Sequence, residues 1–91
     1  MGVTVLLPSL LAEQAGGQKQ FELEAPTVGA ALRALPVRDL LFDERGELRP
    51  LVNIYVDGED VRERGGIEAE LHDGETMRVV AAVAGGQVSQ L

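Results

Sequence analysis

The chain has 91 residues, 45% of them hydrophobic and 25% charged, which is ordinary for a folded domain and leaves room for one core. It contains no cysteine, and this excludes disulfides, thiolate metal sites and a cysteine nucleophile. Its net charge of -7 opposes binding to nucleic acid or to an anionic membrane.

The negative charge is unevenly distributed along the chain. Residues 1–50 hold seven acidic and five basic residues, whereas residues 51–91 hold eight acidic and three basic ones. Two interpretations stay open for the acidic half: a solvated surface that keeps the protein soluble, or a face that steers it toward a basic partner.

The start of the chain carries no basic segment of the kind that opens a signal peptide, and Pro8 interrupts its apolar residues. No apolar run elsewhere approaches the roughly 20 residues that span a bilayer. We therefore expect no membrane association and a cytoplasmic protein.

Two strands are predicted at the start of the chain. Residues 3–7 alternate between apolar and other side chains, the period of a strand with one face on a core, and Pro8 ends this run. The polar stretch through Gly16 and Gly17 predicts a loop. Residues 21–24 alternate again, so we expect the second strand to form a hairpin with the first, across a long connection.

An amphipathic helix is predicted after Pro26. Thr27 is a suitable N-cap, and Pro36 ends the helix. The apolar residues between them recur at helical spacing: Val28, Ala31, Leu32 and Leu35. A short further turn is expected around residues 40–42.

Three more strands are predicted in the second half. Residues 51–56 form the most strand-like run, and Asp57 and Gly58 close it as a turn. Residues 67–71 alternate with acids as a short edge segment, and residues 77–82 form the last strand. This order predicts an α+β protein with a β-grasp fold, in which a mixed sheet is covered by one main helix. In this fold the first and last strands lie side by side, so the chain leaves the last strand as a tail that begins near Val83.

Residues 71–86 carry the most specific pattern of the chain. A turn at Asp73 and Gly74 precedes the apolar last strand, and Gly85 and Gly86 follow that strand closely. This pattern resembles the closing segment of the ubiquitin-like sulfur carriers, which include the small subunit of molybdopterin synthase, the thiamin sulfur carrier and the sulfur carriers of cysteine synthesis. The order of elements extends the resemblance over residues 1–86.

The resemblance implies a sulfur carrier and not an enzyme. An E1-like activating enzyme would use ATP to adenylate the carboxyl group of Gly86, and a sulfur donor would displace AMP to leave a thiocarboxylate. A sulfur-accepting biosynthetic enzyme, which makes cysteine, thiamin, molybdopterin or a specialised metabolite, would then take the sulfur. The chain itself would hold no cofactor and no metal.

The residue types of the tail suit this chemistry. The tail that must enter a partner's active site consists of Val83, Ala84, Gly85 and Gly86. Two glycines carry no Cβ and have wide backbone freedom, which a threaded tail requires. The alternative interpretation is that Gly85 and Gly86 only begin a flexible tail.

Residues 87–91 depart from the usual pattern of these carriers, most of which end at the second glycine. With this extension attached, Gly86 is an amide and has no carboxylate to adenylate, so the chain would be a precursor. A zinc-dependent JAMM-type peptidase would cut between Gly86 and Gln87. The alternatives are a tolerated disordered terminus or a chain that has lost sulfur transfer. We expect a domain over residues 1–84 and a flexible, removable tail over residues 85–91.

No catalytic site is predicted. His72 is the single histidine and precedes a turn, so an exposed turn residue is expected there and no ordinary zinc site. Ser9 and Ser89 have no base near them in sequence. The second function that stays open is a ubiquitin-like protein-binding module or protein modifier, and formation of a thiocarboxylate would separate it from a sulfur carrier.

Overall fold

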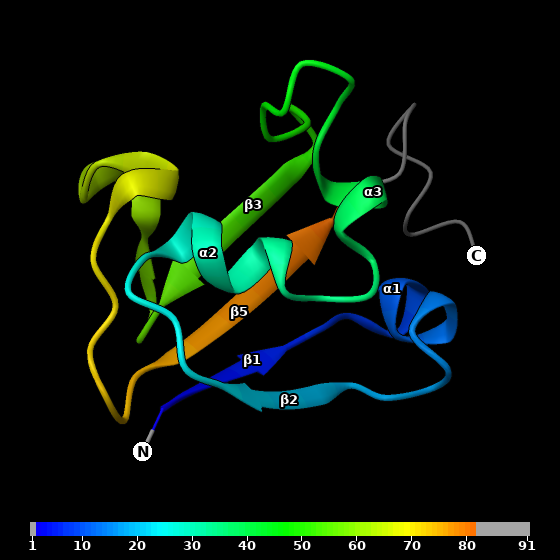
Figure 1. Ribbon diagram of the computed structural model, residues 1–91, viewed down its shortest axis with the longest axis horizontal. Coiled ribbons are helices and arrows are strands. Elements are labelled where there is room, and N and C mark those ends of the chain that lie inside the picture. The colour runs from blue at the N-terminus through cyan, green and yellow to red at the C-terminus, as the bar shows by residue number, and fades with distance from the viewer. Residues whose placement is uncertain (1, 82–91) are drawn as a thin grey trace.

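A mixed five-stranded sheet organises residues 2–81, the part of the chain that the computed structural model describes (Figure 1). The strands are β1 (Val3–Leu6), β2 (Gln20–Leu23), β3 (Val52–Val56), β4 (Glu59–Asp60) and β5 (Thr76–Ala81). They lie in the order β2-β1-β5-β3-β4, and β5 runs parallel to β1 and antiparallel to β3. This is the predicted β-grasp arrangement, in which the first and last strands are neighbours.

Alternation along the strands separates the two faces of the sheet. Val3 and Val5 of β1 and Met77 and Val79 of β5 are buried, whereas Val80 is 39% exposed because it points to the other face. Ile54 and Val56 of β3 complete the buried face. A one-residue slip in register would expose all of these side chains, so the pattern specifies the pairing.

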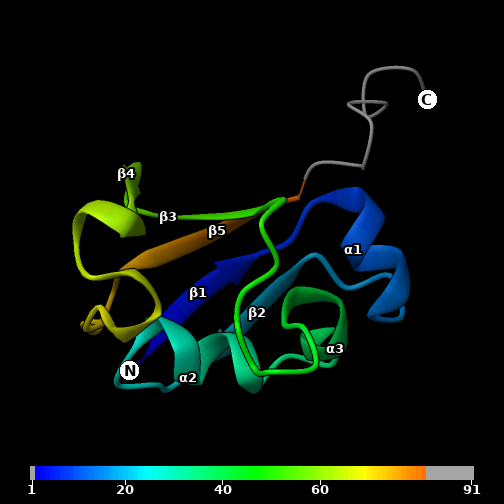
Figure 2. The same cartoon turned by 90° about the horizontal axis from the view of Figure 1, so that it is seen from above.

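The helices cover one face of this sheet (Figure 2). They are α1 (Ser9–Gln14), α2 (Val28–Arg33) and α3 (Arg38–Leu41), and two short 3-10 helices are η1 (Val61–Glu63) and η2 (Gly66–Glu68). Figure 2 shows α2 and α3 against the sheet and α1 beyond the end of β1, near the end of β5. No helix among residues 2–81 has the length and hydrophobicity that a membrane crossing requires.

Helix α2 forms where the sequence predicts it. The Thr27 side chain accepts a hydrogen bond from the Ala30 N–H at 3.2 Å, which satisfies a free donor of the first turn. The predicted apolar stripe is buried in full: Val28, Ala31, Leu32 and Leu35. Gly29 lets α2 approach η2 closely, because a Cβ there would lie 3.0 Å from the Ile67 carbonyl oxygen. The short turn predicted around residues 40–42 overlaps α3, which covers residues 38–41.

The prediction of a loop between the first two strands is wrong at its start, where α1 forms. Leu11 and Ala12 of α1 are buried, so burial of this short apolar face offsets the weak intrinsic stability of a six-residue helix. The expected main helix is present as α2, and the short helices α1 and α3 accompany it.

The predicted short strand over residues 67–71 is also wrong. The backbone of this segment bonds to the entry of α2: the Val28 N–H donates to the Ala69 carbonyl at 2.9 Å, and the Leu71 N–H donates to the Pro26 carbonyl at 3.0 Å. The edge strand next to β3 is instead β4, which follows the turn after β3. Here tertiary hydrogen bonding outweighs the alternating pattern.

Candidate functional site

The predicted site residues lie outside the described part of the chain. They are Val83, Ala84, Gly85, Gly86 and Gln87. The structure describes the point from which the chain continues into them, which is Ala81 at the end of β5. Strand β5 is the central strand of the sheet, and at its end Ala81 pairs with Val52 of β3.

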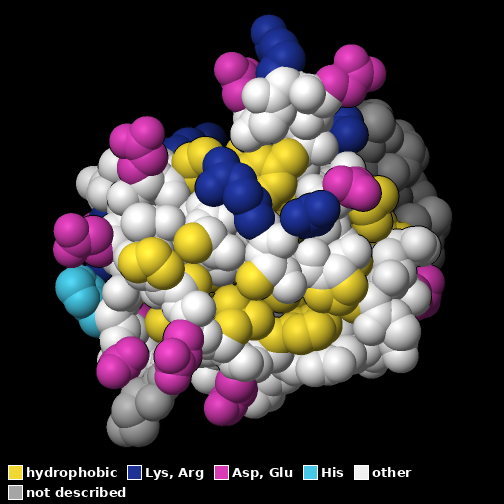
Figure 3. All heavy atoms as spheres, in the orientation of Figure 1, with side chains coloured by type: hydrophobic (Ala, Val, Ile, Leu, Met, Phe, Trp, Pro, Cys, Tyr) yellow, Lys and Arg dark blue, Asp and Glu magenta, His cyan; other side chains and the backbone are white. Residues whose placement is uncertain are grey.

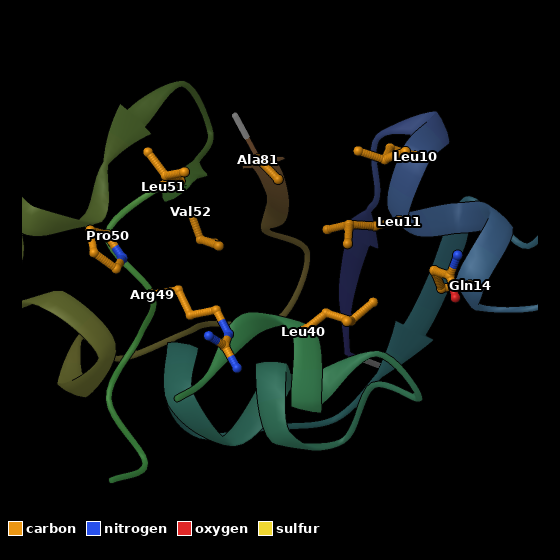
Figure 4. Close-up of a pocket in the computed structure, with 9 residues that line it drawn as sticks. All are labelled: Leu10, Leu11, Gln14, Leu40, Arg49, Pro50, Leu51, Val52 and Ala81. Carbon is orange, nitrogen blue, oxygen red and sulfur yellow. The ribbon is translucent and has the colours of Figure 1, made fainter. Parts of the chain in front are cut away.

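An apolar hollow of about 620 Å³ opens beside Ala81. Figure 4 shows its lining side chains converging from α1, α3, the segment before β3, and the end of β5. The lining residues are Leu10, Leu11, Gln14, Leu40, Arg49, Pro50, Leu51, Val52 and Ala81. Six of the nine are leucine, valine or alanine, and none is acidic.

Three pairs of adjacent apolar residues lie at this hollow, and every member except Leu41 lines it. In each pair the second residue belongs to the buried core: Leu11, Leu41 and Val52. The first residue of each pair is on the surface at the rim, with 48% of Leu10, 44% of Leu40 and 44% of Leu51 exposed. Burial of the core residue of each pair fixes the position of the backbone there, and the side chain of its neighbour then points toward solvent. This surface, formed by Leu10, Leu40, Leu51 and their neighbours around the hollow, is called the rim below.

The loop before β3 is ordered by Asp43. One oxygen of its carboxylate accepts hydrogen bonds from the N–H groups of Arg45 at 2.9 Å and Glu47 at 3.0 Å. The bond from Glu47 is the largest cause that lowers the pKa of Asp43 from its ordinary value of 3.8. The Arg49 N–H then donates to the Leu41 carbonyl at 2.8 Å, which ties the loop to the end of α3. These bonds position the residues that enter the rim.

Arg49 supplies the positive charge at the hollow. Its guanidinium donates to the Asp39 carbonyl at 3.4 Å, and the side chain is exposed. Nearby, the Arg33 guanidinium lies 5.2 Å from the centre of the Phe42 ring, a cation–π contact. In Figure 3 basic side chains gather in the upper middle of the helix-covered face, with apolar surface around them. The hollow itself is lined by apolar groups and one basic side chain, that of Arg49.

The acidic residues of the second half lie at the opposite end of β5. At the start of this strand, Asp57 accepts a hydrogen bond from the Thr76 N–H at 3.0 Å, and Glu75 accepts one from the His72 N–H at 2.8 Å. A strand of this length separates its two ends by about 17 Å. Acidic side chains accordingly border the left of the molecule in Figure 3. The acidic surface and the exit of the tail are thus separate surfaces.

Two ion pairs shape this acidic end. Asp60 binds the Arg62 guanidinium at 2.7 Å, and this side-chain hydrogen bond is the largest cause that lowers the pKa of Asp60. Arg64 lies 3.5 Å from Glu75, and both side chains are largely covered. His72 is an exposed turn residue, as predicted. No group of three or more potential metal-ligating side chains occurs among residues 2–81.

Comparison with known proteins identifies the relatives of this chain. A model of the ThiS family matches residues 5–86. The chain belongs to the ThiS family. The chain is 39% identical over 93 residues to the sulfur carrier protein CysO of Mycobacterium tuberculosis. The match covers 94% of this chain and 100% of the relative.

Solved structures extend the comparison of this ThiS-family chain. One chain of the Amycolatopsis orientalis BexX/CysO complex is 36% identical in sequence to this chain, with a TM-score of 0.78. The match covers 93% of this chain and 100% of the other. The small archaeal modifier protein SAMP1 from Haloferax volcanii is 26% identical, with a TM-score of 0.79 and coverage of 92% and 98%. The β-grasp, ubiquitin-like fold is thereby confirmed.

The family match also bears on the end of the chain. It extends through Gly86 and leaves residues 87–91 outside.

The sequence analysis contains no functional prediction for the rim residues. The available signal was the repeated apolar pair, in which one residue suffices for the core and the other is left over for the surface.

Proposed function

We propose that this protein is a sulfur carrier that is loaded at the carboxyl group of Gly86 after residues 87–91 have been removed. The observation that carries the proposal is the match to the ThiS family, which extends to Gly86 and stops there. The relatives named sulfur carrier protein CysO support it, and so does the direction of β5, which ends in the middle of the sheet just before the predicted tail.

The proposed chemistry begins at a free carboxylate. The Gly86 carboxylate attacks the α-phosphate of ATP in the activating enzyme, which gives an acyl adenylate and releases pyrophosphate. A sulfide-level donor then attacks the acyl carbon, the C–O bond to AMP breaks, and AMP leaves with its electron pair. The thiocarboxylate that remains is the cargo. No group of this chain other than its carboxyl terminus takes part in bond making, so the chain acts as a carrier and not as an enzyme.

Processing must precede loading because an amide offers no oxygen nucleophile for adenylation. Hydrolysis of the Gly86–Gln87 peptide bond creates the required carboxylate, and we assign this step to a JAMM-type metallopeptidase. The two glycines before the bond offer a peptidase backbone without side-chain bulk.

The expected partners are an E1-like activating enzyme and a sulfur-accepting biosynthetic enzyme. The Amycolatopsis orientalis structure, in which CysO is in complex with BexX, is a precedent for a relative that assembles with another protein. Cysteine, thiamin, molybdopterin and specialised-metabolite synthesis are the candidate destinations of the sulfur.

The decisive experiment is measurement of intact mass after incubation with ATP, a sulfide source and the activating enzyme. The chain 1–86 should gain about 16 Da, since sulfur replaces one oxygen of the activated acyl group. The chain 1–91 should gain nothing, and omission of ATP should abolish the gain for chain 1–86. Loading of the full chain without loss of residues 87–91, or failure of the trimmed chain to load, would contradict the proposal.

A ubiquitin-like modifier or protein-binding module is the second candidate function. The similarity to SAMP1 favours it, since that protein is described as a modifier. A modifier would join the Gly86 carbonyl to a lysine amine of another protein, which adds the mass of the whole chain to that protein, whereas a sulfur carrier gains only the mass of sulfur in place of oxygen. The same mass experiment, performed with a lysate from the native host, separates the two functions.

A further inference from the structure

The hollow beside Ala81 has the chemistry of a binding site for an apolar, uncharged segment. The side chains of Leu10, Leu40 and Leu51 are about half exposed at its rim. Covering the apolar surface of such a leucine lowers the free energy. Its polar lining groups are the side chains of Arg49 and Gln14, which offer hydrogen-bond donors to amide or carbonyl oxygens. The guanidinium of Arg49 disfavours a basic occupant.

One segment of this chain matches these requirements. The side chains of residues 87–91 carry no charge, and two of them, those of Val88 and Leu91, are apolar and three positions apart. The remaining three are glutamine and serine, whose side chains can hydrogen-bond at a polar border.

The segment is also tethered next to the hollow. Ala81 forms part of the wall of the hollow, and residues 82–91 follow it directly. Ten residues span at most about 33–36 Å when extended, so Leu91 can reach any part of the rim. A reversal of direction is required, and Gly85 and Gly86 permit backbone conformations that other residues avoid. A short tether of this kind produces a local concentration on the order of millimolar, which makes a small contact sufficient.

We propose that residues 87–91 dock in the hollow of their own chain, with the side chains of Val88 and Leu91 among the rim leucines. This inference concerns the uncleaved chain and does not require that sulfur is ever loaded. Where the proposed function also holds, it has a consequence: cleavage after Gly86 uncovers an apolar surface beside the new carboxyl terminus. Processing would then create the carboxylate and expose the rim in one step.

Methyl NMR of chains 1–91 and 1–86 tests the proposal without any partner protein. The leucine methyl resonances of Leu10, Leu40 and Leu51 should shift between the two chains, and those of Leu23 on the distant strand β2 should not. Nuclear Overhauser effects should connect the methyl groups of Leu91 with those of the rim. Salt does not screen the apolar contact of Val88 and Leu91 with the rim, so most of these shifts should persist in high salt. Val83 is present in both chains and does not contribute to the difference.

Matched variants of chain 1–91 identify the contact. Leu91→Glu should return the rim resonances to their positions in chain 1–86, whereas Gln90→Glu, which adds the same charge one residue away, should leave them docked. Leu40→Glu should release the Leu91 methyl resonances, and Val80→Glu, on the other face of the sheet, should not.

Two results would overturn the proposal. Identical rim resonances in chains 1–91 and 1–86 would show that residues 87–91 do not bind there. Shifts that grow with protein concentration, together with a sedimentation coefficient that rises, would assign the hollow to a second copy. Neither result depends on sulfur loading, so the mass experiment on Gly86 still decides the carrier function separately.

Discussion

Ala81 is paired with Val52 across β5 and β3, and both residues line the apolar hollow at the end of the sheet. Val52 is buried, whereas Ala81 is half-buried and is the last residue that the structure describes. The point where the tail begins is therefore also the edge of the core.

The first prediction is that residues 85–91 contribute little to stability. Every buried core residue of the described chain lies between Val3 and Val79, so removal of residues 85–91 leaves all of these residues in place. Chain 1–84 should melt within about 5 °C of chain 1–91, since that difference corresponds to about 1 kcal/mol for a domain of this size. A docked Leu91 fits within this limit, because closure of the loop opposes its contact. A larger fall in Tm would place residues 85–91 in the core and move the domain boundary.

The second prediction concerns Thr27. Its hydroxyl oxygen is the side-chain cap of α2, and its loss leaves the Ala30 N–H without this acceptor. Thr27→Ala should lower the free energy of unfolding by about 1 kcal/mol, seen as a fall in Tm of about 4–8 °C. Thr27→Ser keeps the oxygen and should retain most of the stability. An equal loss in both variants would assign the effect to packing of the Thr27 methyl group.

How far the fold follows from the sequence is seen in the contrast between α2 and α1. Helix α2 carries a cap, a complete apolar stripe and a terminating proline, so local signals alone place it. Helix α1 has no side-chain cap hydrogen bond, and only Leu11 and Ala12 are buried. Its stability comes from packing, which a sequence pattern does not contain. For the same reason the alternation over residues 67–71 indicates a strand, although this segment bonds to the entry of α2.

The candidate site likewise has one part that the sequence predicts and one part that it does not. The glycine pair is a local motif and is visible in the sequence, whereas the hollow is assembled from four segments that the topology brings together. Leu10 and Leu51 are separated by forty residues, and only the placement of β5 between β1 and β3 makes them neighbours of one opening. Prediction of the rim would require the strand order and the unforeseen helix α1.

The third prediction is that salt slows association with the activating enzyme more than it speeds dissociation. The acidic surface lies at the far end of β5 from the tail, and exposed charges act over roughly 8–10 Å at ordinary ionic strength. Steering by such a surface raises the association rate, while contacts near the tail determine how long the complex lasts. Kinetic binding measurements from low to high salt should therefore show a falling association rate and a nearly constant dissociation rate. An affinity that is flat with salt would leave the acidic residues a solvation role only.

The fourth prediction is a pH dependence that originates at Asp43. Its pKa is lowered in the folded chain, mainly by the hydrogen bond from the Glu47 N–H, so the folded state favours the ionised form. The resulting stability is present above the unfolded pKa, about 3.9, and is lost as the pH falls through the lowered folded value. Asp43→Asn keeps an acceptor oxygen but does not titrate. Its Tm should lie below that of the parent at neutral pH, and the difference should shrink as the pH falls through the lowered pKa of Asp43.

Glu44→Gln is the matched control for this measurement, because it removes a neighbouring charge and keeps the Asp43 oxygen that accepts from the two N–H groups. A Tm difference between Asp43→Asn and the parent that stays constant over the whole pH range would show that shape or packing, and not ionisation, is responsible.

The last prediction separates the role of Gly86 in transfer from any role in folding. A valine at this position has a branched Cβ, which restricts the backbone and adds bulk at the atom that must enter the activating enzyme. In chain 1–86, Gly86→Val should leave Tm unchanged and reduce the yield of thiocarboxylate, measured by intact mass, by about tenfold or more, as expected for misplacement of a reacting group. Ala84→Val adds the same kind of branched side chain two residues earlier and should be tolerated better, because it lies farther from the reacting carbonyl. If the Gly86 variant loads as fast as the parent chain, access to the active site does not require the second glycine. In that case the glycine pair would indicate descent from a sulfur carrier and not a present loading site, which would have to be sought elsewhere on the chain.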